Sequence, residues 1–403
     1  MMAAPKGLRL HIGIFGRRNV GKSSLINLIT NQTLSIVSKI PGTTTDPVEK
    51  AMEIQPLGAV MLIDTAGIDD KGSLGTQRIE RTKRIIDKTD MAVLVVEADI
   101  WGEFEEGLAA IFKSRNIPFM IVCGKSDLAI PSNEFIELIR DKTGVFLIMS
   151  AKTGENKELF YDKLQEITPL NWIKQNTMLG GLVNSGDIVL LVTPIDIQAP
   201  KGRMILPQVQ ALRDVLDSGA ICIFVKENKI TNMLSVLKMP PKLVVCDSQC
   251  VLQTARSVPE NIMLTTFSIL MARLKGDLAV LSGGANAISE LKSGDKVLIA
   301  EACTHHPLKG DIGKEKIPKW LAEFTKADLT IEHCSGKDYP NDIDKYKLII
   351  HCGACVINAQ EMLSRISKAA DANIPITNYG VAISFLQGAL ERSLEPFQNE
   401  LKQ

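Results

Sequence analysis

An eight-residue segment near the start of the chain constrains its fold more than any other feature. Residues 16–23 have the sequence Gly-Arg-Arg-Asn-Val-Gly-Lys-Ser, which fits the pattern G-x-x-x-x-G-K-S. The segment follows the apolar run Leu10–Phe15, which predicts a strand, and opens a helical pattern over Lys22–Thr30. Glycines let backbone N–H groups curl around phosphate, and the helix N-terminus adds positive potential. The segment therefore predicts a nucleoside-phosphate loop in an α/β domain.

Each residue type in this loop has a chemical role. We expect Lys22 to reach the β- and γ-phosphates and the Ser23 hydroxyl to hold Mg²⁺. The loop contributes the following candidate nucleotide-binding residues: Gly16, Asn19, Val20, Gly21, Lys22, Ser23 and Ser24.

Strand and helix patterns alternate along residues 1–172, which we predict to form the first domain. Alternation of this kind indicates βαβ units and a mostly parallel sheet that is covered on both faces. A lapse in the pattern near residues 171–181 marks the domain boundary. The predicted strands are Leu10–Phe15, Ala59–Ile63, Ala92–Val96, Pro118–Val122 and Val145–Met149.

Three further motifs follow the loop in an order that suits a sensor of the γ-phosphate. Asp64 and Gly67 come directly after an apolar strand, where a carboxylate approaches Mg²⁺ and a glycine N–H approaches the γ-phosphate. Asp127 ends another strand and suits a guanine base. Doubly wound sheets bind ligands at such strand ends. The candidate catalytic residues are Lys22, Thr44, Asp64 and Gly67, and the candidate base-binding residues are Lys125, Asp127, Ser150, Ala151 and Lys152.

Across residues 8–170 the chain resembles the TrmE–Era branch of translation-factor-like GTPases. The resemblance implies a preference for guanine and slow GTP hydrolysis, with Thr44 as a Mg²⁺ ligand. It places Ile68 where many small GTPases carry a glutamine that orients water, and it gives Asn19 the place of an asparagine that ligates an activating K⁺ ion. One position departs from the pattern, because the usual Asn-Lys-x-Asp motif begins here with Gly124. This change loosens the base site.

The rest of the chain carries two further α/β patterns. We predict a middle domain over residues 178–261 and a third domain over residues 262–403. The middle domain has no phosphate loop and no cluster of titratable residues, which favours an interaction surface. The segment Leu281–Ala285 contains two glycines, and without a following Lys-Ser it predicts a tight turn.

Three thiols and two imidazoles follow two predicted strands of the third domain. Cys303 and His305 come after the strand Lys296–Ala300, and His351, Cys352 and Cys355 come after Leu348–Ile350. Haem attachment is excluded, because the pattern C-x-x-C-H is absent here. A redox dithiol at Cys352 and Cys355 would leave Cys303 and both histidines unused. Buried cysteines without a ligand are a further alternative. Spacing alone leaves structural zinc and an iron–sulfur cluster open.

The order of these motifs resembles HydF, the family of maturation GTPases for [FeFe]-hydrogenases. A C-x-H segment, a long spacer and an H-C-x-x-C segment lie downstream of a TrmE–Era-like domain, and the stretches 202–210, 267–270, 275–277 and 294–306 also resemble the family. The resemblance implies a GTPase domain, a dimerisation domain and a domain that binds a [4Fe-4S] cluster. It also implies a scaffold that assembles a di-iron subcluster precursor with two radical-SAM partners and delivers it to apo-hydrogenase. The implied cluster ligands are Cys303, Cys352 and Cys355, with His305 and His351 open.

Composition narrows the classes of partner. Lys and Arg together number 46, as do Asp and Glu, which argues against a globally basic nucleic-acid binder. We therefore expect no nucleic-acid partner. No apolar run approaches the 18 residues of a membrane span and the first ten residues lack the apolar core of a signal peptide, so we expect a cytoplasmic protein without membrane partners. The resemblance to HydF implies a homodimer. The expected cofactors are GTP, Mg²⁺, K⁺ and a [4Fe-4S] cluster. Two alternatives stay open: an RNA- or ribosome-associated GTPase with structural zinc, and a GTP-gated thiol redox sensor.

Overall fold

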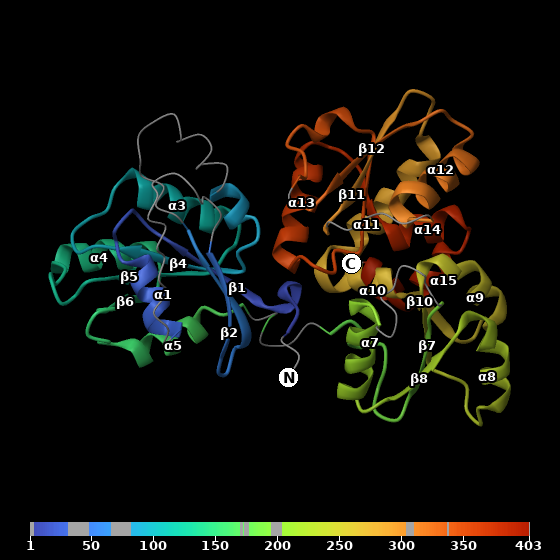
Figure 1. The fold of residues 1–403 in the computed structure, drawn as a ribbon, viewed down its shortest axis with the longest axis horizontal. Coiled ribbons are helices and arrows are strands. Elements are labelled where there is room, and N and C mark those ends of the chain that lie inside the picture. Colours follow the sequence, from blue (N-terminus) through green and yellow to red (C-terminus); the bar gives the residue numbers. More distant parts are fainter. Residues whose placement is uncertain are drawn as a thin grey trace. The chain divides into compact units, whose positions relative to one another are not determined.

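The computed structural model describes residues 4–30, 48–65, 82–169, 172, 177–194, 204–303, 310–336 and 338–402. The chain divides into two compact units, Met1–Gln175 and Asn176–Gln403, here called the N-terminal unit and the C-terminal unit (Figure 1). Each unit is described by itself. Within the described residues, no helix has the length and apolar character needed to cross a membrane.

The N-terminal unit is built on a six-stranded sheet with the order β2-β3-β1-β4-β5-β6. All neighbouring strands run parallel except β2 and β3, which are antiparallel. The mostly parallel sheet predicted from the sequence is therefore confirmed. Its strands are β1 (Leu10–Phe15), β2 (Val48–Ile54), β3 (Gly58–Asp64), β4 (Met91–Val96), β5 (Phe119–Cys123) and β6 (Phe146–Ile148).

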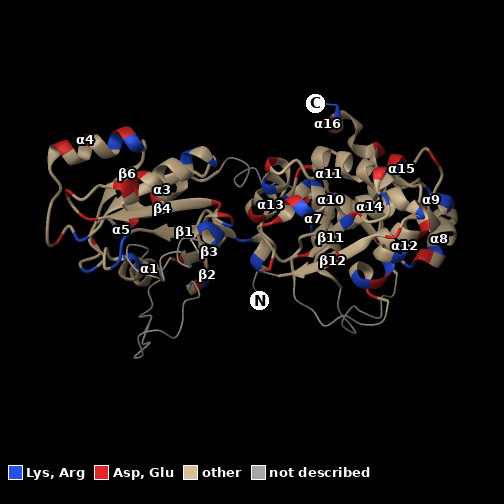
Figure 2. Ribbon diagram, turned by 90° about the horizontal axis from the view of Figure 1, so that it is seen from above, with Lys and Arg blue, Asp and Glu red and all other residues tan. Residues whose placement is uncertain are grey.

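Helices cover both faces of this sheet. The helices α1 (Lys22–Thr30) and α5 (Lys157–Glu166) pack their apolar residues against one face. The helices α3 (Glu103–Ser114) and α4 (Asn133–Lys142) pack against the other. Ser132 caps α4 by accepting a hydrogen bond from the Phe135 N–H, and Figure 2 shows residues of both charges along this helix.

The C-terminal unit contains two parallel four-stranded sheets that share one hydrophobic core. The second sheet has the order β10-β9-β7-β8, and the third has the order β12-β11-β13-β14. The strands are β7 (Ile188–Val192), β8 (Ile221–Val225), β9 (Leu243–Cys246), β10 (Met263–Thr266), β11 (Lys296–Glu301), β12 (Thr330–Ser335), β13 (Leu348–His351) and β14 (Ile376–Asn378).

The strand β10 belongs to the second sheet, although it lies past the domain boundary predicted at residues 261–262. It pairs with β9 in the second sheet, although the sequence placed residues from 262 onward in the third domain. The four-residue strand is too short to give a pattern that distinguishes it from a connection. The second sheet therefore extends past residue 261.

Helix α10 (Phe267–Lys275) lies in the shared core of the C-terminal unit and is buried along most of its length. The other helices of this unit are α7 (Leu206–Asp217), α8 (Ile230–Val236), α9 (Val251–Ser257), α11 (Leu278–Gly284), α12 (Ile317–Thr325), α13 (Ala359–Asp371), α14 (Tyr379–Leu386), α15 (Leu390–Leu394) and α16 (Gln398–Leu401).

The tight turn predicted over Leu281–Ala285 is wrong, because α11 continues to Gly284. A Cβ atom at Gly284 would lie 2.0 Å from the carbonyl oxygen of Ile376 on β14. The glycine therefore lets the helix approach the strand backbone closely. Gly284 is therefore explained by the close approach of α11 to β14 and not by a turn of the chain.

Candidate functional site

The loop between β1 and α1 has the form that its sequence predicts. Gly16 has φ = +145°, and a Cβ atom there would lie 2.4 Å from the carbonyl oxygen of Val95. Only glycine fits this conformation and this approach to β4. The Lys22 ammonium is buried and donates hydrogen bonds to the carbonyl oxygens of Gly16 (2.8 Å) and Arg17 (2.6 Å). The loop thus closes around the ammonium that is expected to meet phosphate.

Ser23 and Asp64 come together at the start of α1 and the end of β3. The Ser23 hydroxyl donates a 2.8 Å hydrogen bond to the Asp64 carboxylate. Burial raises the pKa of the Asp64 carboxyl, and the Ser23 hydrogen bond and the Lys22 charge oppose part of that rise. A hydroxyl and a carboxylate in contact beside the loop are a donor set that suits Mg²⁺.

The loop is also tied to α3 by an ion pair that the sequence did not predict. The Arg17 guanidinium donates two hydrogen bonds, of 2.6 and 2.7 Å, to the two oxygens of Glu105. Glu105 is buried, and its carboxylate also accepts the N–H of Gly102 at the start of α3. Such a bidentate pair fixes geometry as well as charge. No local pattern reveals it, since the partners are far apart in the sequence.

The candidate base-binding residues meet at the ends of β5 and β6. The Ser150 hydroxyl donates a 2.6 Å hydrogen bond to Asp127, and this bond holds the pKa of the carboxyl below its usual range. Lys152 lies 3.7 Å from the same carboxylate. Lys125 pairs with Glu97 at 2.5 Å. The structure therefore brings three of the five predicted base-site residues, Asp127, Ser150 and Lys152, into contact through their side chains.

Gly124 lies beside the phosphate loop, where a Cβ atom would make ordinary van der Waals contacts. A Cβ atom at this position would lie 3.4 Å from the carbonyl oxygen of Val20 and 3.6 Å from Cγ1 of Val95. The asparagine that usually begins this motif would therefore lie against the phosphate loop. Its absence removes one connection between the loop and the base site.

The remaining predicted residues of the nucleotide site differ in their exposure to solvent. Val20 is buried, whereas Asn19 and Ser24 are exposed. Asn19 has φ = +61°, a conformation that asparagine tolerates better than most residues. The predictions for Thr44, Gly67 and Ile68 lie outside the described residues.

The predicted thiols lie at the ends of two neighbouring strands of the third sheet. Ala300 of β11 pairs with His351 of β13, so Cys303 and Cys352 leave adjacent strands at the same edge. Burial raises the pKa of Cys352 to about 12 and that of Cys303 to about 11, and the charge of Cys355 adds to both shifts. Among the described side chains, no group of three His, Cys, Asp or Glu already has an arrangement that would hold a metal ion.

Backbone N–H groups point at the Cys352 sulfur. The Ala302 N–H donates to it at 3.1 Å, and the Ala354 N–H donates to it as well. Ala354 has φ = +53°, a left-handed conformation that lets the C-x-x-C turn curl around this sulfur. Hydrogen bonds to sulfur and three thiol donors are chemistry that fits an iron–sulfur cluster.

His351 is buried and has both ring nitrogens engaged. Nδ1 donates to the Cys352 carbonyl at 2.8 Å, and Nε2 accepts a 2.9 Å hydrogen bond from Arg365. Burial and the Arg365 charge lower the pKa of the ring to about 3, so the imidazole is neutral. This geometry favours a supporting role for His351 over direct ligation. His305 lies outside the described residues.

Family models match successive parts of the chain. A model described as the hydrogen maturase F dimerization domain matches residues 178–276. Another, described as the hydrogen maturase F tetramerization domain, matches residues 279–396. Together they cover more than half of the 403 residues. The chain belongs to the hydrogen maturase F family.

The N-terminal unit contains a GTPase domain. A family model described as 50S ribosome-binding GTPase matches residues 11–125. The chain is 31% identical over 176 residues to GTPase Der of Wolinella succinogenes, covering 41% of this chain and 36% of that protein. It is 34% identical over 156 residues to the tRNA modification GTPase MnmE of Caldicellulosiruptor saccharolyticus, covering 38% and 33%. The chain thus spans about a third of the length of these curated relatives.

Solved structures include a similar chain described as a probable GTP-binding protein engB. It is 25% identical, and the alignment covers 39% of this chain and 98% of that one with a TM-score of 0.29.

Two side chains that contact His351 and the C-x-x-C turn were not predicted from the sequence. Arg365 on α13 contacts His351, and Lys275 at the end of α10 contacts the C-x-x-C turn. Each lies at an ordinary helical position for a charged residue, so nothing in the local pattern distinguishes it from a solvated side chain. Their burial became visible only in the fold.

Two of the five cysteines outside the predicted cluster motifs contact each other. Cys246 and Cys250 share a hydrogen bond between their thiols, and Thr254 donates to the Cys250 sulfur at 3.8 Å. Burial raises the pKa of Cys123, Cys222 and Cys334 to about 11 in each case, which keeps those thiols neutral.

Proposed function

We propose that this hydrogen maturase F hydrolyses GTP slowly and carries a [4Fe-4S] cluster. We further propose that it assembles the di-iron subcluster precursor with two radical-SAM maturases and delivers the precursor to apo-[FeFe]-hydrogenase. The observation that carries the proposal is the placement of Cys303, Cys352 and Cys355 at adjacent strand ends in a chain that also has a complete phosphate loop. The precursor is cargo and not a resident cofactor.

The proposed nucleotide chemistry uses Lys22, Ser23 and Asp64. Lys22 would stabilise charge on the β- and γ-phosphates, and Ser23 would hold Mg²⁺ with Asp64 beside it. Thr44 and Gly67 would complete the site around the γ-phosphate. Asn19 would ligate a K⁺ ion, which acts on the transferring phosphoryl group as an arginine finger does. Equal turnover in potassium and sodium buffers would contradict the K⁺ part of this proposal.

The proposed iron chemistry belongs to the C-terminal unit alone. Cys303, Cys352 and Cys355 would bind three irons of the cluster, and the N–H groups aimed at Cys352 would stabilise its thiolate. When bound, the cluster would supply a fourth iron site for an exchangeable ligand. His351 would hold the C-x-x-C turn through the Cys352 carbonyl. We propose that the nucleotide state orders the loops of Thr44 and Gly67 and thereby controls partner release.

The proposed homodimer would use the open edge of the second sheet. The strand β8 is the outer strand of that sheet, and its Ile221 side chain is 51% exposed. On the preceding helix α7, Leu216 and Val209 are 57% and 44% exposed. An exposed apolar edge strand is a template for pairing with a second copy around a two-fold axis. The dimerization-domain match, residues 178–276, contains both elements.

The proposed carrier function is tested by measuring transfer of the di-iron precursor to apo-[FeFe]-hydrogenase. The protein is incubated anaerobically with both radical-SAM maturases, separated from them, and then mixed with apo-[FeFe]-hydrogenase. We expect hydrogen evolution to appear with the wild-type protein and to be absent with Cys352→Ser. Activation by both proteins would overturn the carrier role of the thiols. Stoichiometric zinc in the wild-type protein would instead favour the structural zinc alternative.

The role of the nucleotide is tested in the same system. Release of the maturases is compared with GTP, with a non-hydrolysable analogue and without nucleotide. We expect release to depend on the nucleotide, and equal release in all three conditions would contradict the switch.

A further inference from the structure

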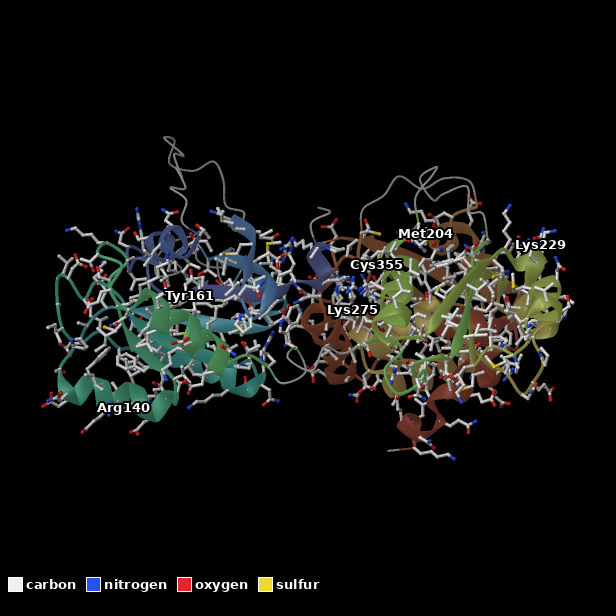
Figure 3. All side chains as sticks on the ribbon, turned by 90° about the horizontal axis from the view of Figure 1, so that it is seen from below. Arg140, Tyr161, Met204, Lys229, Lys275 and Cys355 are labelled. Carbon is white, nitrogen blue, oxygen red and sulfur yellow. The ribbon has the colours of Figure 1, made fainter. Side chains whose placement is uncertain are left out.

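The side chain of Lys275 is buried beside the C-x-x-C turn. Lys275 is the last residue of α10 and is 3% exposed. Its ammonium donates hydrogen bonds to the carbonyl oxygens of Ala354 (3.1 Å), Cys355 (3.1 Å) and Ile357 (2.7 Å). Figure 3 shows Lys275 and Cys355 next to each other. The three N–H bonds of the ammonium therefore all have acceptors within the turn.

The charge of this ammonium has no carboxylate partner. Among the described residues, no Asp or Glu side chain forms an ion pair with Lys275. Carbonyl groups satisfy its hydrogen bonds but do not neutralise its charge, and an uncompensated buried charge is costly. The carbonyl groups that surround it belong to the turn that carries the Cys352 and Cys355 thiols. The buried cation thus faces a place where negative charge is expected.

The turn divides its backbone groups between these two sides. Its carbonyl oxygens at Ala354 and Cys355 face Lys275, whereas the Ala354 N–H faces the Cys352 sulfur. Lys275 therefore binds the carbonyl oxygens of the turn on one side, and the Ala354 N–H stays directed at the Cys352 sulfur on the other. Because every N–H of the ammonium is used, Lys275 can act on a bound group only through its charge and through the shape of the turn.

Lys275 reaches the turn from the neighbouring sheet. Helix α10 follows β10 of the second sheet, and the dimerization-domain match ends at residue 276. The tetramerization-domain match begins at residue 279 and contains the turn. One side chain therefore connects the dimerization domain to the cysteine turn of the next domain.

We propose that Lys275 is a positioning residue that supplies the fixed counter-charge for an anionic iron–sulfur group on Cys352 and Cys355 and connects that group to the dimerization domain. The inference rests on the proposed function. A cluster bound by thiolates carries net negative charge that grows on reduction, so a fixed cation beside it raises the reduction potential. Neighbours of this kind also hold the ligands in place.

The test uses the full-length protein after anaerobic cluster reconstitution. Lys275→Met removes the charge and the donors, Lys275→Gln keeps amide donors without charge, and Lys275→Arg keeps the charge. Lys292→Met is the matched control, because Lys292 is exposed and precedes β11, at the strand end opposite Cys303. The readouts are the midpoint potential from a spectroscopic redox titration, the rate of iron loss to a chelator, and the GTP hydrolysis rate.

We expect Lys275→Met and Lys275→Gln to lower the midpoint potential, and Lys275→Met to lose iron about tenfold faster than the wild type. Lys275→Arg should restore the potential, and Lys292→Met should change neither value. A role in folding alone would not produce a potential that follows charge in the Gln and Arg variants. If Lys275→Met fails to fold, as judged by circular dichroism and elution volume, the Gln variant decides the question.

Two results would overturn different parts of the account. A wild-type protein that binds no iron would overturn the proposed function. Equal potentials and equal iron retention in wild type, Lys275→Met and Lys275→Gln would overturn the role of Lys275 and leave the proposed function intact.

Discussion

The phosphate loop and the cysteine turn each surround a lysine ammonium with backbone carbonyl oxygens, but the two lysines come from different parts of the chain relative to their sites. At the phosphate loop, the carbonyl oxygens of Gly16 and Arg17 surround a lysine from the same contiguous motif. At the cysteine turn, three carbonyl oxygens surround Lys275, which comes from a helix that follows another sheet. One site is assembled by a single stretch of chain, whereas the other depends on the packing of two sheets.

This difference determines how each site responds to damage. A local motif keeps its shape while its own strand and helix persist, since its contacts are close in sequence. The cysteine turn needs β11, β13, α10 and α13 in place together, because Arg365 and Lys275 support it from two helices. We therefore expect the nucleotide site to be the more independent of the two.

The substitution Lys22→Ala tests most directly whether the nucleotide site is independent of the cysteine turn. We expect Lys22→Ala to lower the GTP hydrolysis rate by about 100-fold to 1,000-fold, because it removes the ammonium proposed to stabilise charge on the β- and γ-phosphates. Iron content should stay at the wild-type value, since Lys22 lies in the other unit. Phosphate release and iron analysis on the same preparation measure both quantities. A parallel loss of iron would contradict the independence of the sites.

The reverse experiment uses Cys352→Ser. The hydroxyl is a poor iron ligand, so we expect the iron content after reconstitution to fall severalfold from about four per chain. GTP hydrolysis should stay within about twofold of the wild type. Cys222→Ser is the matched control, because Cys222 lies on β8 of the second sheet and away from the turn. Iron loss in both variants would show that the assay does not report on the predicted ligands.

Arg365 tests how far the cysteine turn depends on tertiary packing. Arg365→Met would leave Glu361 without its ion-pair partner and would leave Nε2 of His351 without a donor. We expect the C-terminal unit to lose about 3 kcal/mol of unfolding free energy, as when one partner of a buried pair is removed. Denaturant unfolding followed through Trp320 measures this loss. An unchanged midpoint would mean that the His351 contact does not stabilise the fold.

Gly124 tests whether the nucleotide site is less complete than its motif suggests. Gly124→Asn places an amide near the Val20 carbonyl, where a Cβ atom would be 3.4 Å away. We expect GDP to bind about fivefold more tightly, equivalent to one added hydrogen bond. Gly124→Ala serves as the control, because it adds the Cβ without the amide. Weaker binding by Asn than by Ala would show that this space cannot hold the usual side chain.

The smallest effect concerns Glu49 on β2 in the N-terminal unit. Although burial raises the pKa of Glu49, its pairing with Lys6 and Lys88 lowers it to about 2, against an ordinary value of 4.5. The lowered pKa stabilises the folded state above about pH 4.5, and this contribution is lost as the pH falls toward 2. After allowance for solvent screening, we expect Glu49→Gln to cost less than about 1 kcal/mol at pH 7. Hydrogen exchange of β3 amides at pH 7 and pH 3 measures it, and an equal effect at both pH values would contradict the ion pair.

The sequence predicted most of the first sheet, because its central strands are continuous apolar runs. Helix α1 has the bounds Lys22–Thr30 that were expected. The strand β2 was not predicted, since charged residues interrupt its apolar ones and all but its last residue are exposed or half-buried at the edge of the sheet. The short strands β10 and β14 give no periodic pattern, so they also escaped prediction.

The sequence predicted more of the contacts in the nucleotide site than of those around the cysteine turn. The contacts between Ser23 and Asp64 and between Ser150 and Asp127 follow from motifs at the ends of neighbouring strands. Placing Cys303 and Cys352 at one edge required the pairing of β11 with β13, which the sequence suggested but could not measure. The support from Lys275 depends on the packing of α10 between two sheets, and no periodic pattern encodes that packing.

The most direct test of the account is the metal content of the protein purified without oxygen. Wild-type protein and a variant with Cys303, Cys352 and Cys355 all replaced by Ser are analysed for iron, acid-labile sulfide and zinc per chain. The account predicts about four iron and four sulfide in the wild type and neither in the variant. One zinc per wild-type chain, or iron retained without the three thiols, would contradict it.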